Sequence, residues 1–266
     1  MIDMFENFKN KINRYGTLNG YDILKNIAFF TMVIDHMGYF LFPTVGILRI
    51  IGRMSAPIFF FLFGYSYKEN QARDRQLLLL GFITALIEIA VDINNIIPMF
   101  NILFSLYMSG KFIEICNTYY KKHFALFLLT ILFVFMPVNF ILKYVFDYGI
   151  FAILMVFAGY LFKWSSRNQN FITATVFITL SFCLNQINTF YRVVDKVNII
   201  VSIVLYLVYM TFLYLYFYNA KTHLIKQYNI KIKSVEKLLL FISRYSLILY
   251  PVHIILILLV KFLWQL

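Results

Sequence analysis

Long apolar runs are the feature that most constrains what this sequence can fold into. Of its 266 residues, 62% are hydrophobic and only 14% are charged, and the mean hydropathy is +0.77. A soluble domain carries about a quarter charged residues, whereas several runs here reach the roughly 20 apolar residues that cross a bilayer as a helix. The composition therefore predicts an all-α, polytopic transmembrane helical bundle and excludes a soluble globular domain.

Hydropathy divides the chain into about nine predicted spans. They cover residues 23–42, 45–67, 77–97, 99–119, 124–142, 144–163, 171–188, 197–218 and 237–261. Residues 1–15 place apolar side chains at helical spacing among lysines and an arginine, which is typical of an amphipathic helix lying on the membrane surface. Because no repeat or soluble segment interrupts the spans, we expect residues 1–266 to form a single integral membrane domain.

The distribution of basic residues predicts the orientation. Lysines and arginines gather in the loops on the side of the N-terminus, and the opposite side carries only Lys143, Arg192, Lys196 and Lys261 between or beside its spans. Cytoplasmic loops are enriched in these residues. We therefore expect the N-terminus on the cytoplasmic side of the membrane and the C-terminus on the outer side. The net charge of +12 then reflects this bias and attraction to anionic lipid, and it does not indicate nucleic-acid binding.

The first two predicted spans contain Asp35, His36, Arg49 and Arg53, in addition to Lys25 near the start of the first span. Charges at this depth are costly and usually face a cavity, a partner or a substrate. Asp35 and His36 are consecutive and therefore point about 100° apart around a helix. We expect His36 to act as a general base and Asp35 to hold a neighbouring cation such as Arg49 or Arg53, an i,i+4 pair on one face.

The predicted topology sorts the polar residues of the spans into two levels. His36, Arg49, Arg53 and His253 fall in the outer half, whereas Lys25, Lys111 and Arg244 fall towards the cytoplasm. Lys25 and His36 are eleven residues apart, so they share one helix face at a separation of about 16 Å along the axis. This arrangement suits an enzyme that holds the phosphates of cytoplasmic coenzyme A at the inner level and transfers its acyl group at the outer level. For Lys111, a simple internal ion pair with Glu114 is the alternative. No metal-ligand spacing is present.

The residues around these charges carry a resemblance to a known family. Asp35-His36, then Leu48-Arg49-Ile50-Ile51-Gly52-Arg53 and Ala56-Pro57-Ile58-Phe59, resemble the TraX family, and residues 101–106 and the C-terminal Tyr250-Pro251-Val252-His253 match it too. Members of that family are membrane acetyltransferases that acetylate the N-terminus of conjugative pilin. The Lys25…His36 spacing and the arginine pair are also similar to the broader membrane acyltransferase superfamily, although the arginines there are usually three residues apart.

The resemblance implies a multi-pass protein of the bacterial inner (cytoplasmic) membrane. It would use acetyl-CoA as donor and pilin as partner, with His36, Asp35, Arg49, Arg53 and His253 catalytic and with Lys25, Lys111 and Arg244 binding the donor. Two alternatives stay open: an O-acyltransferase acting on a glycan or lipid hydroxyl, and a proton or anion transporter. Transporters often show repeated halves and broken helices, and this sequence shows neither. The sequence also leaves open whether His36 or His253 is the base.

Overall fold

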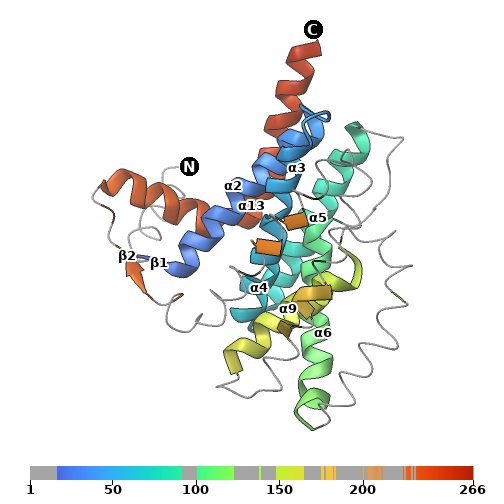
Figure 1. Cartoon of the computed structure of the whole chain (residues 1–266), viewed down its shortest axis with the longest axis vertical. Helices are drawn as coiled ribbons and strands as arrows, with labels where there is room; N and C mark the ends of the chain where they lie inside the picture. The colour runs from blue at the N-terminus through green and yellow to red at the C-terminus, as the bar shows by residue number, and fades with distance from the viewer. Residues whose placement is uncertain are drawn as a thin grey trace.

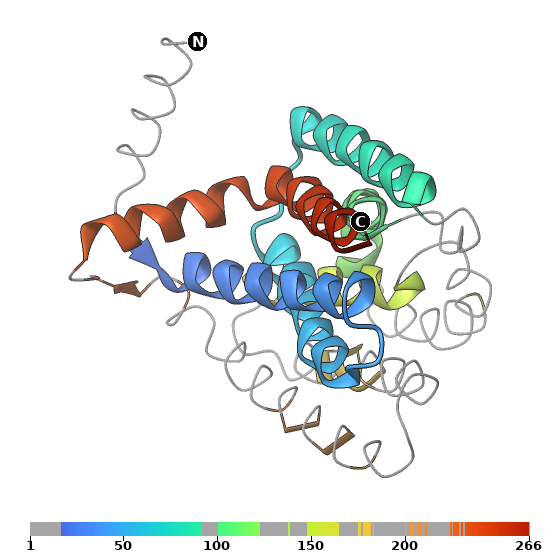
Figure 2. The same ribbon diagram turned by 90° about the horizontal axis from the view of Figure 1, so that it is seen from above.

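The structure is a computed structural model, and it describes most of the first half of the chain and its C-terminal helix. The described residues are 17–91, 101–122, 138, 148–164, 175–176, 178–181, 183, 200, 203–204, 207–208, 211, 224, 226–228, 230 and 232–265. Within them the helices are joined by short turns and connections, and the only strands described are two of two residues each, which confirms the all-α prediction. Figures 1 and 2 show the helices packed as a bundle.

The first helix, α2 (Gly20–Phe40), begins at a strong cap. The side chain of Asn19 accepts a hydrogen bond from the Asp22 backbone, while the Asp22 carboxylate accepts one from the Asn19 backbone. This capping box satisfies two of the amides that a helix start leaves unpaired. The helix ends just before the Phe42-Pro43-Thr44 segment, which separates it from the next helix.

The second predicted span consists of two helices, α3 (Gly46–Arg53) and α4 (Ser55–Tyr65), with a single turn residue between them. Pro57 lies in the first turn of α4, where the missing N–H costs little because the first amides of a helix have no partner within it. Together residues 46–65 are long and apolar enough to cross a membrane. The turn aims the last residue of α3 and the start of α4 into the bundle.

The remaining described helices are α5 (Gln71–Val91), α6 (Ile102–Lys122), α9 (Gly149–Trp164) and α13 (Lys233–Gln265). Residues 233–264 of α13 form a second segment that could span a membrane, and residues 149–163 are a shorter apolar helix. The helix α13 contains Pro251 and bends along its length, with its two halves running in different directions in Figure 1. A proline within a helix removes one backbone hydrogen bond and causes such a bend.

The count of about nine spans and the orientation of the termini stay predictions. The predicted spans 124–142, 171–188 and 197–218 lie largely outside the described residues, as does the predicted surface helix at 1–15. The predicted spans that the structure describes all fall on helices, with ends displaced by a few residues. On α5, Leu79, Phe82, Ile83 and Leu86 are exposed, as expected for side chains that face lipid.

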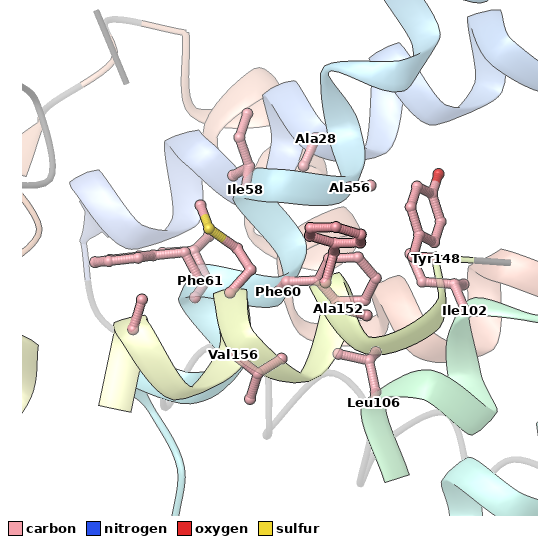
Figure 3. Packing of buried hydrophobic residues seen from close by; sticks show 14 of the residues in the cluster. Ala28, Ala56, Ile58, Phe60, Phe61, Ile102, Leu106, Tyr148, Ala152 and Val156 are labelled. Carbon is pink, nitrogen blue, oxygen red and sulfur yellow. The ribbon is translucent and has the colours of Figure 1, made fainter. Parts of the chain in front are cut away.

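The centre of the core is the contact between α4 and α9, two helices that approach each other backbone to backbone. A Cβ atom at Gly64 would overlap the carbonyl of Val156, and one at Gly159 would overlap the carbonyl of Phe61. Figure 3 shows Phe60 and Phe61 from α4 against this surface, and neither ring is exposed to solvent. Small residues are the usual means of bringing helices this close in a membrane.

The beginning and the end of the described chain lie side by side. The strands β1 (Leu18–Asn19) and β2 (Gln227–Tyr228) pair antiparallel, and α2 packs against α13 (Figure 2). The side chain of Asn26 donates to the carbonyl of Leu239, which fixes the two helices at this end. The candidate site is built along this α2–α13 contact.

Candidate active site

Asp35 and His36 point to different sides of α2, as their consecutive positions in the sequence predict. Asp35 faces α3, where its Oδ2 lies 2.8 Å from Nη1 of Arg49. His36 faces α13, where its Nδ1 lies 2.7 Å from Nε2 of His253. The two consecutive residues therefore connect both neighbouring helices to one turn of α2.

Asp35 is the counter-charge for both arginines. Arg49 donates to the carboxylate and also to the Asp35 carbonyl, and Nε of Arg53 lies 3.9 Å from Oδ1 of Asp35. Arg53 also donates to the hydroxyl of Tyr148 at 3.0 Å. A carboxylate shared in this way lowers the cost of holding two guanidinium groups inside the bundle. The prediction that Asp35 holds a cation of the neighbouring span is confirmed.

The close approach of α2 and α3 depends on Gly52. A Cβ atom at this position would overlap the backbone and Cβ of Asp35. Gly38 on α2 has a similar role, because a Cβ atom there would lie 2.8 Å from Cβ of Leu48. The absence of side chains at these two positions lets the aspartate reach both arginines.

The hydrogen bonds of the two histidines determine which nitrogen of each carries the proton. Nδ1 of His253 lies 3.0 Å from the carbonyl oxygen of Leu249, which can only accept, so this nitrogen is the donor. Neutral His253 must then accept at Nε2, and His36 must donate from Nδ1. The remaining nitrogen of His36, Nε2, carries a lone pair and is the free base of the pair.

Aromatic rings enclose the two imidazoles. The ring of Tyr250 lies edge-on to both, at centroid distances of 5.8 Å from His36 and 5.6 Å from His253, and Phe40 stacks on His36. Because Tyr250 and His253 are both on α13 beside Pro251, the bend of that helix affects their position relative to α2. We call Asp35, His36, Arg49, Arg53, Tyr148, Tyr250 and His253 the histidine layer.

A second polar group surrounds the start of α2. Asp22 is fully buried, accepts from the hydroxyl of Ser243 at 2.7 Å and pairs with Arg244 at 3.4 Å. Lys25 lies one turn further along, donates to the Ser243 carbonyl and covers the ring of Tyr21. Lys25 and His36 therefore both face α13, as their spacing predicts.

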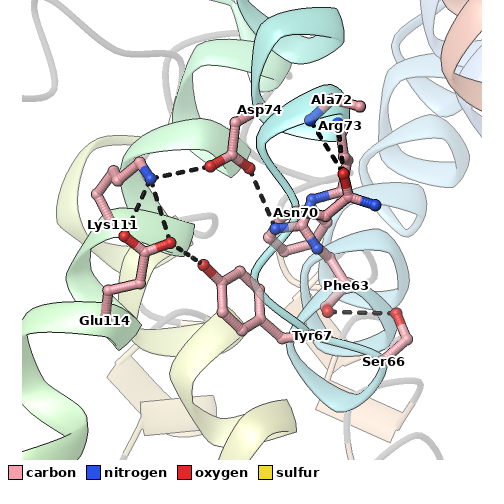
Figure 4. Close-up of polar contacts among 9 residues, drawn as sticks. All are labelled: Phe63, Ser66, Tyr67, Asn70, Ala72, Arg73, Asp74, Lys111 and Glu114. Carbon is pink, nitrogen blue, oxygen red and sulfur yellow. Dashed lines mark hydrogen bonds and ion pairs between the residues drawn. The ribbon is translucent and has the colours of Figure 1, made fainter.

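A third polar group joins the start of α5 to α6 (Figure 4). Lys111 lies 2.9 Å from both Asp74 and Glu114, and Tyr67 donates to Glu114 at 2.7 Å. The ion pair that the sequence allows between Lys111 and Glu114 is present. Asp74 also accepts from Arg73. Burial opposes the charge of Asp74, but the hydrogen bonds from Lys111 and Arg73 outweigh it and hold the pKa of this carboxyl below its usual value.

We refer to these two groups together as the cation layer, comprising Asp22, Lys25, Tyr67, Arg73, Asp74, Lys111, Glu114 and Arg244. The layer begins about three turns of α2 before the histidine layer. The assignment of the two layers to the cytoplasmic and outer sides of the membrane stays a prediction. Lys25, Lys111 and Arg244 do not converge, because Lys111 and Arg244 each pair with a carboxylate.

A cavity of about 140 Å³ lies beside Lys25 and Arg73 of the cation layer and extends to Tyr250 of the histidine layer, although neither histidine lines it. Its lining includes Tyr21, Lys25, Ser66 and Arg73 near the cation layer, and Tyr250 beside the histidines. Met32, Phe59 and leucines of α6 and α13 line the stretch between them. The sequence did not indicate Arg73 as a site residue. It lies near a loop among other basic residues, and the predicted topology places it with the cytoplasmic loop charges.

The described residues contain no group of histidine, cysteine, aspartate and glutamate side chains that could hold a metal ion. The site is instead an imidazole pair beside a carboxylate-bound arginine pair, on helices that enclose a partly apolar cavity. These features define a helical membrane protein with a buried imidazole pair and two arginines near it.

Comparison with known proteins identifies the family. The chain matches the TraX protein family over residues 20–261 and belongs to it. A curated relative, an uncharacterized protein of Rickettsia prowazekii, is 44% identical over 52 residues, which is 20% of this chain and 21% of the relative. The match thus spans about a fifth of the relative's length. No solved structure matches. The family match agrees with the resemblance carried by residues 35–59 and 250–253.

Proposed function

We propose that this protein is a membrane acetyltransferase that moves an acetyl group from acetyl-CoA to the N-terminal amine of pilin. The observation that carries the proposal is the hydrogen-bonded pair of His36 and His253, which leaves Nε2 of His36 as a base inside the membrane-embedded bundle. Membership of the TraX family supports pilin as the acceptor. The cavity that reaches Tyr250 supports an approach of the donor from the cation layer.

In this reaction the acceptor amine attacks the thioester carbonyl, so a C–N bond forms and the C–S bond breaks. His36 takes the proton that the amine loses and returns it to the departing thiolate, which leaves as the free thiol. The negative charge that develops on the carbonyl oxygen requires a donor, and the guanidinium groups of Arg49 and Arg53 supply candidate donors in the same layer. His253 holds the ring of His36 in the tautomer that the reaction needs.

The test is the mass of pilin that is co-expressed with the protein. Wild type should increase the mass of the mature pilin N-terminal peptide by one acetyl group. His36→Ala should reduce acetylation by at least about a hundredfold, because general-base catalysis contributes about 10²–10⁴. Ile27→Ala, a change at an exposed position of the same helix, is the matched control and should retain activity. Acetylation of pilin by His36→Ala at the wild-type rate would reject the proposed base.

The same experiment addresses the acceptor. A hydroxyl acceptor would use the same base. If pilin stays unmodified and mild alkali releases acetate from lipid or glycan, the acceptor is a hydroxyl and the proposed chemistry is unchanged. No acyl transfer to any of these acceptors, together with proton or anion flux in vesicles, would favour transport.

A further inference from the structure

The cavity between the two layers has one polar end and a largely apolar interior. Tyr21, Lys25, Ser66 and Arg73 lie at the polar end. Residues 21 to 32 of α2 line its length, which corresponds to about 16 Å along the helix. Its other end is the ring of Tyr250, which contacts both histidines. The cavity therefore fits a long, thin ligand with a charged head.

The charge of Lys25 is available to such a ligand. Among the described residues, no carboxylate lies within ion-pairing distance of its ammonium group. The ammonium group donates to the Ser243 carbonyl and lies 5.3 Å from the ring centroid of Tyr21. An ammonium has three donors, so this arrangement leaves capacity for an anion in the cavity.

Arg73 presents a second, more rigid donor to the same space. Its guanidinium group stacks on the rings of Phe63 and Tyr67, at 4.9 and 4.6 Å from their centroids, and pairs with Asp74 through Nη2. Its Nε is buried and has no hydrogen-bond partner among the described residues. A buried donor without a partner costs free energy, and an oxyanion in the cavity would supply the missing acceptor.

The neighbouring cations differ from these two. Lys111 is held by two carboxylates and Arg244 by Asp22, and neither lines the cavity. Asp74 is shared between Arg73 and Lys111, so the charge of Arg73 is only partly compensated.

We propose that Lys25 and Arg73 form a phosphate-binding site at the mouth of this cavity, which holds a phosphate-headed chain with its far end beside His36 and His253. Two ligands share this chemistry: the donor thioester, whose phosphates precede a long flexible arm, and an anionic phospholipid. The inference deepens the proposed function, on which it rests for the identity of the donor, and it assigns donor binding to Arg73 in place of Lys111 and Arg244.

The test measures binding without chemistry. The full-length protein is placed in phosphatidylcholine nanodiscs, and the dissociation constants of coenzyme A and of pantetheine, which lacks phosphates, are measured by calorimetry. Arg73→Gln and Lys25→Gln should each weaken coenzyme A binding about tenfold or more, the loss expected when one charge-assisted hydrogen bond is removed. Their effect on pantetheine should stay within about twofold, because pantetheine has no phosphate for either cation to contact.

Matched controls separate this effect from general charge and from misfolding. Arg75 is exposed on the same helix and Lys68 is exposed nearby, so Arg75→Gln and Lys68→Gln should leave both dissociation constants within about twofold. Arg73→Lys keeps the charge without the planar fork and should bind coenzyme A with intermediate affinity. If pantetheine and coenzyme A weaken equally in Arg73→Gln, the arginine is structural and the inference is wrong. The inference would also be wrong if Arg73→Gln and Lys25→Gln both bind coenzyme A as wild type does and if phosphatidylglycerol does not compete for the site.

A second arm distinguishes the two phosphate sources. Replacing part of the phosphatidylcholine with phosphatidylglycerol should leave coenzyme A binding unchanged if the donor is the ligand. If phosphatidylglycerol weakens coenzyme A binding to wild type but not to Arg73→Gln, the result would support the phosphate site and assign it to lipid. Pilin acetylation is assayed separately. Coenzyme A binding that requires Arg73, without acetylation, would reject the proposed function alone, whereas acetylation with Arg73-independent binding would reject this inference alone.

Discussion

The histidine layer and the cation layer contain similar residue types but pair them differently. In the cation layer, Lys111, Arg244 and Arg73 each meet a carboxylate, and those contacts join α2 to α13 and α5 to α6. In the histidine layer, two imidazoles meet each other, and one carboxylate serves two arginines. The first arrangement neutralises charge and stabilises the fold, whereas the second keeps a base and cationic donors close together. Under the proposed function, the histidine layer serves chemistry, whereas Lys111 and Arg244 serve packing.

His253 offers the most direct test of this contrast, because its proposed role is to position another residue. His253→Ala removes the acceptor for Nδ1 of His36 and should lower kcat of acetyl transfer by about 10–100-fold, the usual cost of losing an orienting partner. The KM for acetyl-CoA should change little. His253→Gln, whose side-chain carbonyl can accept the same hydrogen bond, should recover part of kcat. A higher KM for acetyl-CoA with an unchanged kcat would show that His253 binds the ligand and does not position His36.

Gly52→Ala tests whether the histidine layer depends on the close contact of α2 and α3. The added methyl group would overlap Asp35, so the helices must separate. Overpacking of this kind costs about 1–3 kcal/mol, which should lower the thermal transition in detergent and reduce acetylation. Gly81→Ala is the control, because its methyl group would meet only the movable ring of Phe104 at 3.2 Å. Equal losses in both variants would show that Gly52 is not special.

Arg49→Lys asks how specific the arginine pairing is. Arg49 donates from one nitrogen to both the carboxylate and the carbonyl of Asp35, and it stacks on Tyr39. Lysine keeps the charge but loses the planar group, so we expect kcat to fall about tenfold with little change in stability. The initial rate of acetylation checks this, and a fully active variant would show that Arg49 acts only as a point charge.

Asp74 should give the smallest effect, and one that depends on pH. Because its folded pKa lies below the usual value of about 3.9, its stabilisation is present above that pH and is lost as the pH falls through the folded value. Asp74→Asn should therefore reduce stability at pH 7 by about 1 kcal/mol. The difference in melting temperature from wild type should shrink below about pH 4. A difference that persists at pH 3 would show that charge is not its cause.

Sequence reasoning predicted the parts of this molecule that depend on local spacing. Three features follow from helical geometry: the different directions of Asp35 and His36, the shared face of Lys25 and His36, and the Lys111–Glu114 pair. It did not predict the partners that lie far apart in the chain. The contact of His36 with His253 and the pairing of Arg244 with Asp22 depend on how α13 packs and bends. Arg73 was not predicted, because a position near a loop gives no sign in the sequence that the side chain lines a cavity.

The distance in sequence between His36 and His253 has a consequence for biosynthesis. The two residues are separated by 217 positions, and the β1–β2 pair joins the chain across a similar interval. Helices of a membrane protein insert into the bilayer in the order in which they are synthesised. The helix α2 is therefore in the membrane while most of the chain is still being made. His36 therefore acquires its hydrogen-bond partner only when α13 inserts, so the imidazole pair forms after nearly the whole chain has been made.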